Sequence, residues 1–306
     1  MTKSKLYFLC FLIFFSCVNA QKVKQVKKDK EADLYPENIN GWVLNRVFEK
    51  EAFDTSYSLT LKGVKYNIQL YVPRNNKRQL ILFLPGWNLP ASDWKTKTHV
   101  VDSALSLGYC ALLVDMGKSI YLDTFYNNTR SDYKNHPTRQ WLWDIVLRPY
   151  RDAGFFSDVY NGLKSHVFGL STGARGAVAL AQDHYLTVNF VAALSGDYNP
   201  LLDTTDALMI NAMGKFYQNQ ERWELGSNNL LQKGAFSGYL YICHGKKDKV
   251  VKVQHSLEFA DSLKSQNSKD QGWPFYTYFP EDSGHDYIFW NDAGLKALNQ
   301  LRVLYP

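Results

Sequence analysis

Two kinds of apolar pattern along the chain predict two kinds of β-strand. Tyr57–Leu61 and Lys65–Val72 alternate polar and apolar residues on either side of Lys62-Gly63, which predicts a hairpin at a sheet edge. Short, mainly apolar segments are typical of parallel strands that are covered on both faces. Six such segments follow the hairpin: Leu80–Leu84, Tyr109–Val114, His166–Leu170, Phe190–Leu194, Tyr239–His244 and Phe275–Phe279.

Helical patterns lie between these strands and complete the predicted architecture. They cover Ser92–Leu107, Pro137–Ala153, an Ala-rich run ending at Ala181, His255–Ser265 and Asp292–Leu304. Strands that alternate with helices predict an α/β fold: a mostly parallel eight-stranded sheet flanked by helices, in one domain. Residues 197–238 contain no clear strand, so we expect an insertion above the sheet after the sixth strand.

The N-terminus has the pattern of an export signal. Lys3 and Lys5 precede an apolar run over Leu6–Phe15, and Val18-Asn19-Ala20 provides small residues for cleavage. We therefore expect residues 1–20 to be a signal peptide, 21–40 a polar linker and 41–306 the folded domain of a secreted or periplasmic protein. The alternative is a lipoprotein signal with a lipid anchor at Cys17. Ten apolar residues are too few to span a bilayer as a helix, so we expect no stable membrane insertion.

Composition narrows the function classes. The chain has 306 residues, of which 45% are apolar, enough for one large core. Its net charge of +6 falls to +4 without the two lysines of the signal, which does not favour a nucleic-acid partner. Cys110 and Cys243 lie in apolar runs, which predicts buried thiols, with a disulfide as the alternative. The sequence contains no metal-ligand spacing and no phosphate-binding glycine loop, so we expect no metal and no cofactor.

The segment Ser165–Ala181 carries the strongest chemical signal. A short apolar run leads into Gly169-Leu170-Ser171-Thr172-Gly173, and an Ala-rich helical run follows. This is the pattern of a nucleophile elbow, in which a strained strand-to-helix turn exposes a serine hydroxyl. Glycines two residues away on each side let strand and helix approach closely. The alternative is an ordinary strand-to-helix turn.

Residues just past the other strand ends supply partners for Ser171, because chemistry in open parallel sheets lies at the carboxyl ends of the strands. His285 follows the last predicted strand and is the candidate base, with His244 as the other contender. Asp248 follows the preceding strand and is the candidate acid, with Asp197 as the main alternative and Glu281 and Asp282 as weaker ones. The chain order Ser, Asp, His is that of α/β-hydrolases.

An acyl-transfer site also needs oxyanion donors and a pocket. The backbone N–H of Thr172, directly after the nucleophile, is one expected donor, and that of Trp87 in the loop after Leu80–Leu84 is the other. Aromatic residues in this loop, in 120–143 and in the insertion are expected to wall the substrate pocket. The candidates are Trp87, Tyr121 and Trp223.

At these motifs the sequence resembles the esterase branch of the α/β-hydrolases that includes S-formylglutathione hydrolases, feruloyl and acetylxylan esterases, and mycolyltransferases. The resemblance covers most of residues 65–304. It rests on the blocks 82–94, 114–121, 169–177, 194–198, 216–223 and 284–290. It implies Ser171 as nucleophile, Asp248 as acid, His285 as base, and Trp87 and Thr172 as oxyanion donors.

The sequence departs from this family at two positions near the site. Pro85 replaces the usual histidine before Gly86, which leaves a backbone oxyanion donor intact. Ala174-Arg175 replaces the second glycine after the elbow and brings a cation to the start of the nucleophile helix, as a packing or salt-bridge device.

Together these patterns predict a secreted serine esterase that works through an acyl-enzyme. Export and the family resemblance favour a small-molecule or carbohydrate-linked ester as substrate. Two alternatives remain open: a serine peptidase of the prolyl-oligopeptidase type, and a non-catalytic secreted binding protein on a hydrolase scaffold.

Overall fold

The computed structural model describes residues 52–152, 164–183, 187–224, 226, 238–267 and 274–306. The chain divides into two compact units, Met1–Asn45 and Arg46–Pro306, and every described residue belongs to the second. The predicted signal peptide, its Cys17 alternative and the predicted linker lie outside the described residues.

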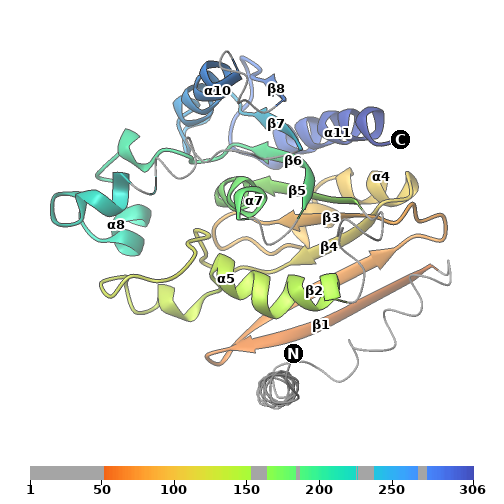
Figure 1. Ribbon diagram of the computed structural model, residues 1–306, viewed down its shortest axis with the longest axis horizontal. Coiled ribbons are helices and arrows are strands. Elements are labelled where there is room, and N and C mark those ends of the chain that lie inside the picture. Colours follow the sequence, from red (N-terminus) through yellow and green to blue (C-terminus); the bar gives the residue numbers. More distant parts are fainter. Residues whose placement is uncertain (1–51, 153–163, 184–186, 225, 227–237, 268–273) are drawn as a thin grey trace, which may run out of the picture. The chain divides into compact units, whose positions relative to one another are not determined.

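The second unit is built on one eight-stranded sheet (Figure 1). Its strands are β1 (Phe53–Leu61), β2 (Val64–Val72), β3 (Gln79–Leu84), β4 (Cys110–Val114), β5 (Lys164–Leu170), β6 (Val188–Leu194), β7 (Tyr239–Cys243) and β8 (Phe275–Tyr278). Their order in the sheet is β1-β2-β4-β3-β5-β6-β7-β8. The β1–β2 and β2–β4 pairs are antiparallel, and all other pairs are parallel. This confirms the predicted edge hairpin and mostly parallel sheet.

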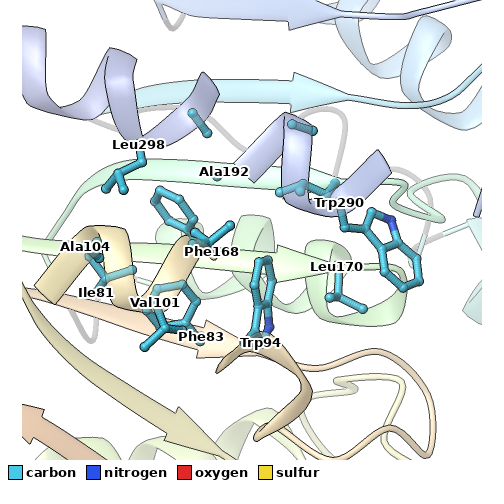
Figure 2. Packing of buried hydrophobic residues seen from close by; sticks show 14 of the residues in the cluster. Ile81, Phe83, Trp94, Val101, Ala104, Phe168, Leu170, Ala192, Trp290 and Leu298 are labelled. Atoms are coloured by element: carbon cyan, nitrogen blue, oxygen red, sulfur yellow. The ribbon is translucent and has the colours of Figure 1, made fainter. Parts of the chain in front are cut away.

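Helices cover both faces of the sheet. On one face, α4 (Val100–Ser106) and α11 (Tyr287–Leu304) pack on alternate residues of the central strands, because successive strand side chains point to opposite faces. Figure 2 shows part of this cluster, including Ile81, Phe83, Trp94, Val101, Phe168 and Leu298. The opposite face is covered by α7 (Thr172–Gln182), which follows β5 and packs against β5 and β6 (Figure 1).

Two predicted helices are interrupted in the structure. The helix predicted over Ser92–Leu107 forms as α3 (Asp93–Thr96) and α4. At the break, the Asn291 side chain accepts from His99 N–H and Thr98 Oγ1 accepts from Val100 N–H, which satisfies two backbone donors at the start of α4. The helix predicted over Pro137–Ala153 consists of α5 (Arg139–Trp141), a π-helical segment (Leu142–Leu147) and α6 (Arg148–Asp152). The Thr138 side chain caps α5 by accepting from Trp141 N–H.

The predicted insertion follows β6. It contains the short helices η3 (Pro200–Leu202), α8 (Ala207–Met213) and η4 (Phe216–Gln218). A small apolar cluster packs the insertion against the segment that follows β4: Ile120 and Tyr133 from that segment, with Met209, Ala212, Met213 and Trp223 from the insertion. The last predicted helices form as α10 (Gln254–Asn267) and α11.

Two further findings concern the unit as a whole. Cys110 and Cys243 are buried free thiols, as predicted. Within the described part of the chain, no helix is both long and apolar enough to cross a membrane.

Candidate active site

Ser171 lies on a strained turn between β5 and α7. Its backbone has φ 55° and ψ −128°, and its N–H donates to Leu194 O at 2.8 Å. The flanking glycines are required by close packing: a Cβ at Gly169 would lie 2.1 Å from Gly173 O, and a Cβ at Gly173 would lie 2.5 Å from Leu84 O. These contacts are the close strand-to-helix approach that the G-x-S-x-G spacing predicts.

The structure brings Ser171, His285 and Asp248 together from three distant segments. His285 Nε2 lies 3.1 Å from Ser171 Oγ, and His285 Nδ1 lies 2.6 Å from Asp248 Oδ2. A carboxylate only accepts hydrogen bonds, so the Nδ1–H donates to Asp248 and Nε2 is left to accept from the serine hydroxyl. The Asp248 side chain is fully buried, whereas that of His285 is 11% exposed. This is the geometry of a catalytic triad.

Asp248 is held as a buried carboxylate by hydrogen bonds to both oxygens. The backbone N–H groups of Val250 and Val251 donate to Oδ1, each at 2.8 Å. His285 and His244 both approach Oδ2. Burial raises the pKa of Asp248, but the hydrogen bonds from the two histidines and from Val251 outweigh burial and hold the pKa well below its ordinary value. The group therefore stays charged beside His285.

The two loops that carry Asp248 and His285 dock on each other. Lys247 N–H donates to Ser283 O at 2.9 Å, and a Cβ at Gly245 would lie only 2.2 Å from that same oxygen. On the core side, the ring of Trp290 meets the His285 ring edge-on, with centroids 4.9 Å apart. The imidazole is thus positioned both by its acid and by α11.

The alternative base and the alternative acid have other partners. His244 lies behind Asp248 and is fully buried, with Nδ1 2.7 Å from Ser256 Oγ. Asp197 forms an ion pair with Arg175, whose Nε lies 3.2 Å from Asp197 Oδ1. The weaker acid candidates Glu281 and Asp282 pair with Lys246 and Lys247. Of the candidate bases only His285 contacts Ser171, and of the candidate acids only Asp248 contacts His285.

The loop after β3 lies directly over Ser171. A Cβ on Gly86 would come 3.0 Å from Ser171 Cβ, so Trp87 follows at the position expected of an oxyanion donor. Among the described residues, neither Trp87 N–H nor Thr172 N–H has a hydrogen-bond partner. Two free donors beside a nucleophile can bind a developing oxyanion.

Side chains from a neighbouring loop hold this donor loop in place. Tyr121 donates its hydroxyl proton to Pro85 O at 2.8 Å, and Asp115 Oδ1 accepts from Ala91 N–H at 2.7 Å. Between these anchors, Asn88 N–H donates to Gly117 O at 2.8 Å. Sequence reasoning missed the supporting role of Tyr121, because nothing local shows which carbonyl a tyrosine will reach.

A cavity of about 370 Å³ opens beside Ser171 beneath the insertion. Trp87, one of the residues expected in a substrate pocket, lines it and packs on Tyr133 with ring centroids 4.8 Å apart. Tyr121 and Trp223, the other two residues expected in a substrate pocket, do not line this cavity. Tyr121 is buried under the donor loop, and Trp223 is buried in the insertion, where its Nε1–H donates to Gly214 O at 2.9 Å.

Two cavity residues were not assigned to the site from the sequence. Arg175 lies one helical turn after Ser171 on α7, and its ion pair with Asp197 agrees with the expected salt-bridge device. His255 lies on α10 and faces the same cavity. The spacing from Ser171 is a signal that could have placed Arg175 at the site. For His255 the sequence contains no such signal.

We compared the sequence and the fold with those of known proteins. No protein-family model matches the sequence, and no curated protein matches it. Solved structures do match. An S-formylglutathione hydrolase from Agrobacterium tumefaciens has a TM-score of 0.63 at 16% identity, over 81% of this chain and 94% of its own. FphF, a fluorophosphonate-binding serine hydrolase of Staphylococcus aureus, has a TM-score of 0.61 at 17% identity, over 81% and 98%.

A peptidase matches at a similar level. An acylaminoacyl peptidase, solved with a chloromethyl ketone, has a TM-score of 0.59 at 13% identity and is matched over 86% of this chain but only 43% of its own. Identities this low establish the fold and not the activity. The protein therefore has the α/β-hydrolase fold, as predicted.

Proposed function

We propose that this protein is a serine esterase that hydrolyses carboxylic esters through an acyl-enzyme intermediate. The observation that carries the proposal is the contact between Ser171 and His285, whose Nε2 lies 3.1 Å from the serine Oγ at the apex of a strained elbow. Asp248 on the other ring nitrogen and two free N–H groups beside the serine complete the groups that acyl transfer needs.

The reaction follows from these positions. Ser171 Oγ attacks the ester carbonyl carbon while its proton passes to His285 Nε2, and Asp248 stabilises the imidazolium that forms. The oxyanion accepts hydrogen bonds from the Trp87 and Thr172 N–H groups. Collapse breaks the C–O bond, and His285 protonates the departing alcohol. Water then attacks the acyl-enzyme, gives a proton to His285, and the acid leaves as Ser171 recovers its proton.

Assays with 4-nitrophenyl acetate test this proposal. The wild type should release 4-nitrophenol, and Ser171→Ala should lower kcat by at least about a thousandfold. Ser106→Ala, the same substitution at an exposed position of α4, is the matched control and should keep full activity. Ser171 Oγ should also attack the phosphorus of a fluorophosphonate, with loss of fluoride and transfer of its proton to His285, and mass spectrometry should detect the phosphonylated Ser171. Equal rates in wild type and Ser171→Ala would sink the esterase proposal and favour a non-catalytic binding protein.

A second candidate, a serine peptidase, is favoured by the likeness to the acylaminoacyl peptidase. The same residues would then cleave an amide, and His285 would protonate the departing amine. Activated esters such as 4-nitrophenyl acetate do not distinguish an esterase from a serine peptidase, because serine peptidases cleave them as well. Release of N-acetylalanine from N-acetylated alanyl peptides at rates comparable to ester cleavage would favour the peptidase.

We further propose that the protein is exported and acts on acyl groups esterified to extracellular carbohydrate. The N-terminal pattern of residues 1–20 supports export. The cavity supports a carbohydrate because aromatic and polar side chains line it together, among them Trp87, Tyr133 and Asn211. Fractionation of expressing cells with mass determination of the mature N-terminus separates cleavage after Ala20 from lipidation at Cys17. Acetylated and feruloylated oligosaccharides, compared with alkyl esters, test the substrate class.

A further inference from the structure

Arg175 occupies the cavity wall one helical turn from the nucleophile. Its guanidinium is fixed from behind by Asp197: Nε lies 3.2 Å from Asp197 Oδ1, and Nη2 donates to the backbone oxygen of the same residue. The side chain is only 6% exposed. Among the described residues, no partner uses the third nitrogen, Nη1. The buried guanidinium of Arg175 lines the cavity and thus keeps its Nη1 group available to donate to a ligand.

His255 offers a second donor to the same cavity. Asn199 N–H donates to its Nδ1 at 3.1 Å. A ring nitrogen that accepts carries no proton, so the proton of the neutral ring is on Nε2. Burial lowers the pKa of His255 to about 4, which keeps the ring neutral near pH 7. No described residue accepts from Nε2–H.

One short segment holds both donors. Asp197 forms the ion pair with Arg175, and two residues later the backbone N–H of Asn199 donates to His255. The Asn199 side chain donates to Glu258 Oε2 at 2.9 Å. The two donor groups are therefore fixed relative to each other by the loop that follows β6. Such preorganisation lowers the cost of binding an acceptor.

Thr172 contributes a third group. Its Oγ1 is buried and has no hydrogen-bond partner among the described residues, although the residue lines the cavity. Thr172 and Arg175 are three residues apart on α7, so their side chains lie on the same face of the helix. A buried hydroxyl without a partner is costly unless a ligand satisfies it.

The other charged groups of the cavity are engaged elsewhere. Lys252 Nζ lies 3.3 Å from Asp203 Oδ2, and Asp203 Oδ1 accepts from the backbone and hydroxyl of Thr205. Asp206 Oδ1 accepts from Met209 N–H at the start of α8. The donors without partners are thus concentrated at Arg175, His255 and Thr172.

We propose that Arg175, His255 and Thr172 form a subsite that binds a carboxylate of the substrate beside Ser171. A carboxylate is an acceptor-only group with two oxygens, and it matches a set of fixed donors that includes a guanidinium edge. This assignment rests on the proposed function for its role in catalysis. It defines the substrate as an ester that carries an acidic group on its acyl or its alcohol part.

Binding to Ser171→Ala, measured by calorimetry, tests the subsite without turnover. Two matched pairs separate the sources of the carboxylate: 3-phenylpropionate against 3-phenylpropionamide for an acyl acid, and galacturonate against galactose for a sugar acid. At least one carboxylate should bind about tenfold or more tightly than its neutral partner. If neither exceeds its partner by more than about twofold, the proposal is overturned. An inactive wild type would sink the esterase proposal and leave this measurement valid.

Variants show whether the carboxylate is bound at the proposed place. Arg175→Met combined with Asp197→Asn removes the ion pair without leaving a buried unpaired charge, and His255→Leu removes the second donor. Each should weaken binding of the preferred carboxylate by about fivefold or more and leave its neutral partner unchanged. His255→Gln retains an N–H donor and should restore most of the affinity. A carboxylate held only by the Trp87 and Thr172 N–H groups would survive all of these changes, which would contradict the assignment.

Lys252→Gln is the matched control for charge. It removes one positive charge from the same cavity, and the Lys252 side chain makes no hydrogen bond to the three proposed donor groups. Carboxylate affinity should change by less than about twofold. A loss equal to that of the Arg175 variant would mean that general attraction, and not this subsite, selects the carboxylate. Thermal unfolding of each variant separates lost binding from lost folding.

Discussion

His244 Nε2 lies 3.1 Å from Asp248 Oδ2, the same carboxylate oxygen that His285 Nδ1 approaches at 2.6 Å. His244 Nε2 is also 2.9 Å from Val251 O, an acceptor, so the proton of this ring is on Nε2 and the Ser256 hydroxyl donates to Nδ1. The carboxylate of the triad is therefore held between two imidazoles. His244, which from the sequence is a candidate base, is in the structure a residue that positions the acid.

His244→Leu should lower kcat for 4-nitrophenyl acetate by about tenfold to a hundredfold, because it removes a donor from a buried carboxylate. The lost hydrogen bond also raises the pKa of Asp248, so this carboxylate becomes protonated at a higher pH and the acidic limb of kcat/KM should move upward. The kinetic constants measured between pH 4 and 8 check both effects. A variant with a lower melting temperature but an unchanged pH profile would contradict the positioning role.

Gly86→Ala should nearly abolish activity. The new Cβ would lie 3.0 Å from Ser171 Cβ and 3.1 Å from Leu170 Cδ1, so the donor loop and the nucleophile must move apart. Misplacement on this scale lowers kcat by about a hundredfold. Gly226→Ala, whose Cβ would lie no closer than 3.7 Å to any described residue beyond its chain neighbours, is the control and should retain wild-type kcat. Retained activity in Gly86→Ala would show that this loop does not supply the oxyanion donor.

Tyr121→Phe should lower kcat about fivefold to tenfold with little change in KM, because Pro85 O loses its hydroxyl donor and the loop that carries Trp87 loosens. Tyr109→Phe makes the same chemical change far from the site, where the hydroxyl donates to Tyr305 O at 3.3 Å, and should leave kcat unchanged. Steady-state kinetics on both variants decide the point. Equal kcat in the two would mean that Tyr121 serves only packing.

Acid should destabilise the fold in a pH window set by two buried histidines. Burial lowers the pKa of His166 to about 3 and that of His255 to about 4, whereas an unfolded histidine titrates near about 6.5. Below that pH the unfolded chain binds more protons than the folded one, so stability falls as pH drops toward 4. Each histidine contributes up to about 1.4 kcal/mol per pH unit. Asp248, with its lowered pKa, adds stability that is lost only below about pH 4.

Urea denaturation at pH 7, 6, 5 and 4 measures this dependence. His255→Gln should reduce the slope between pH 6.5 and 4, because one of the two groups is gone. His99→Gln, at an exposed histidine, should leave it unchanged. A slope unaffected by His255→Gln would show that this ring is not neutral in the folded protein.

The strands were predictable because burial on both faces leaves a local signature. Leu80–Leu84 and Tyr109–Val114 are apolar at every position, and each forms a strand within one residue of the predicted bounds. The break between α3 and α4 was not predictable. One of the backbone donors at the break is satisfied by Asn291, which is distant in sequence, and the helical spacing of Ser92–Leu107 continues through the break.

In the site, too, some features follow from local sequence patterns and others depend on residues that are distant in sequence. The elbow around Ser171 is a local pattern, because its glycines are needed by the turn itself. The choice of Asp248 over Asp197 is not local, since both follow strand ends and both are aspartates. The sequence could not show that Tyr121 and Trp223 are buried away from the cavity, because aromatic composition shows that a side chain packs and does not show whether it faces a cavity or the core.

The sequence by itself determined the order of strands and helices, the strained serine turn and the Ser, Asp, His order along the chain, since each follows from spacing between near neighbours. Only the tertiary structure decided which acid meets which histidine, that His244 holds Asp248 from behind, and that Arg175 and His255 face one cavity. The physical reason is that hydrogen bonds and burial depend on distances between atoms, and residues far apart in sequence come into contact only when the sheet has assembled.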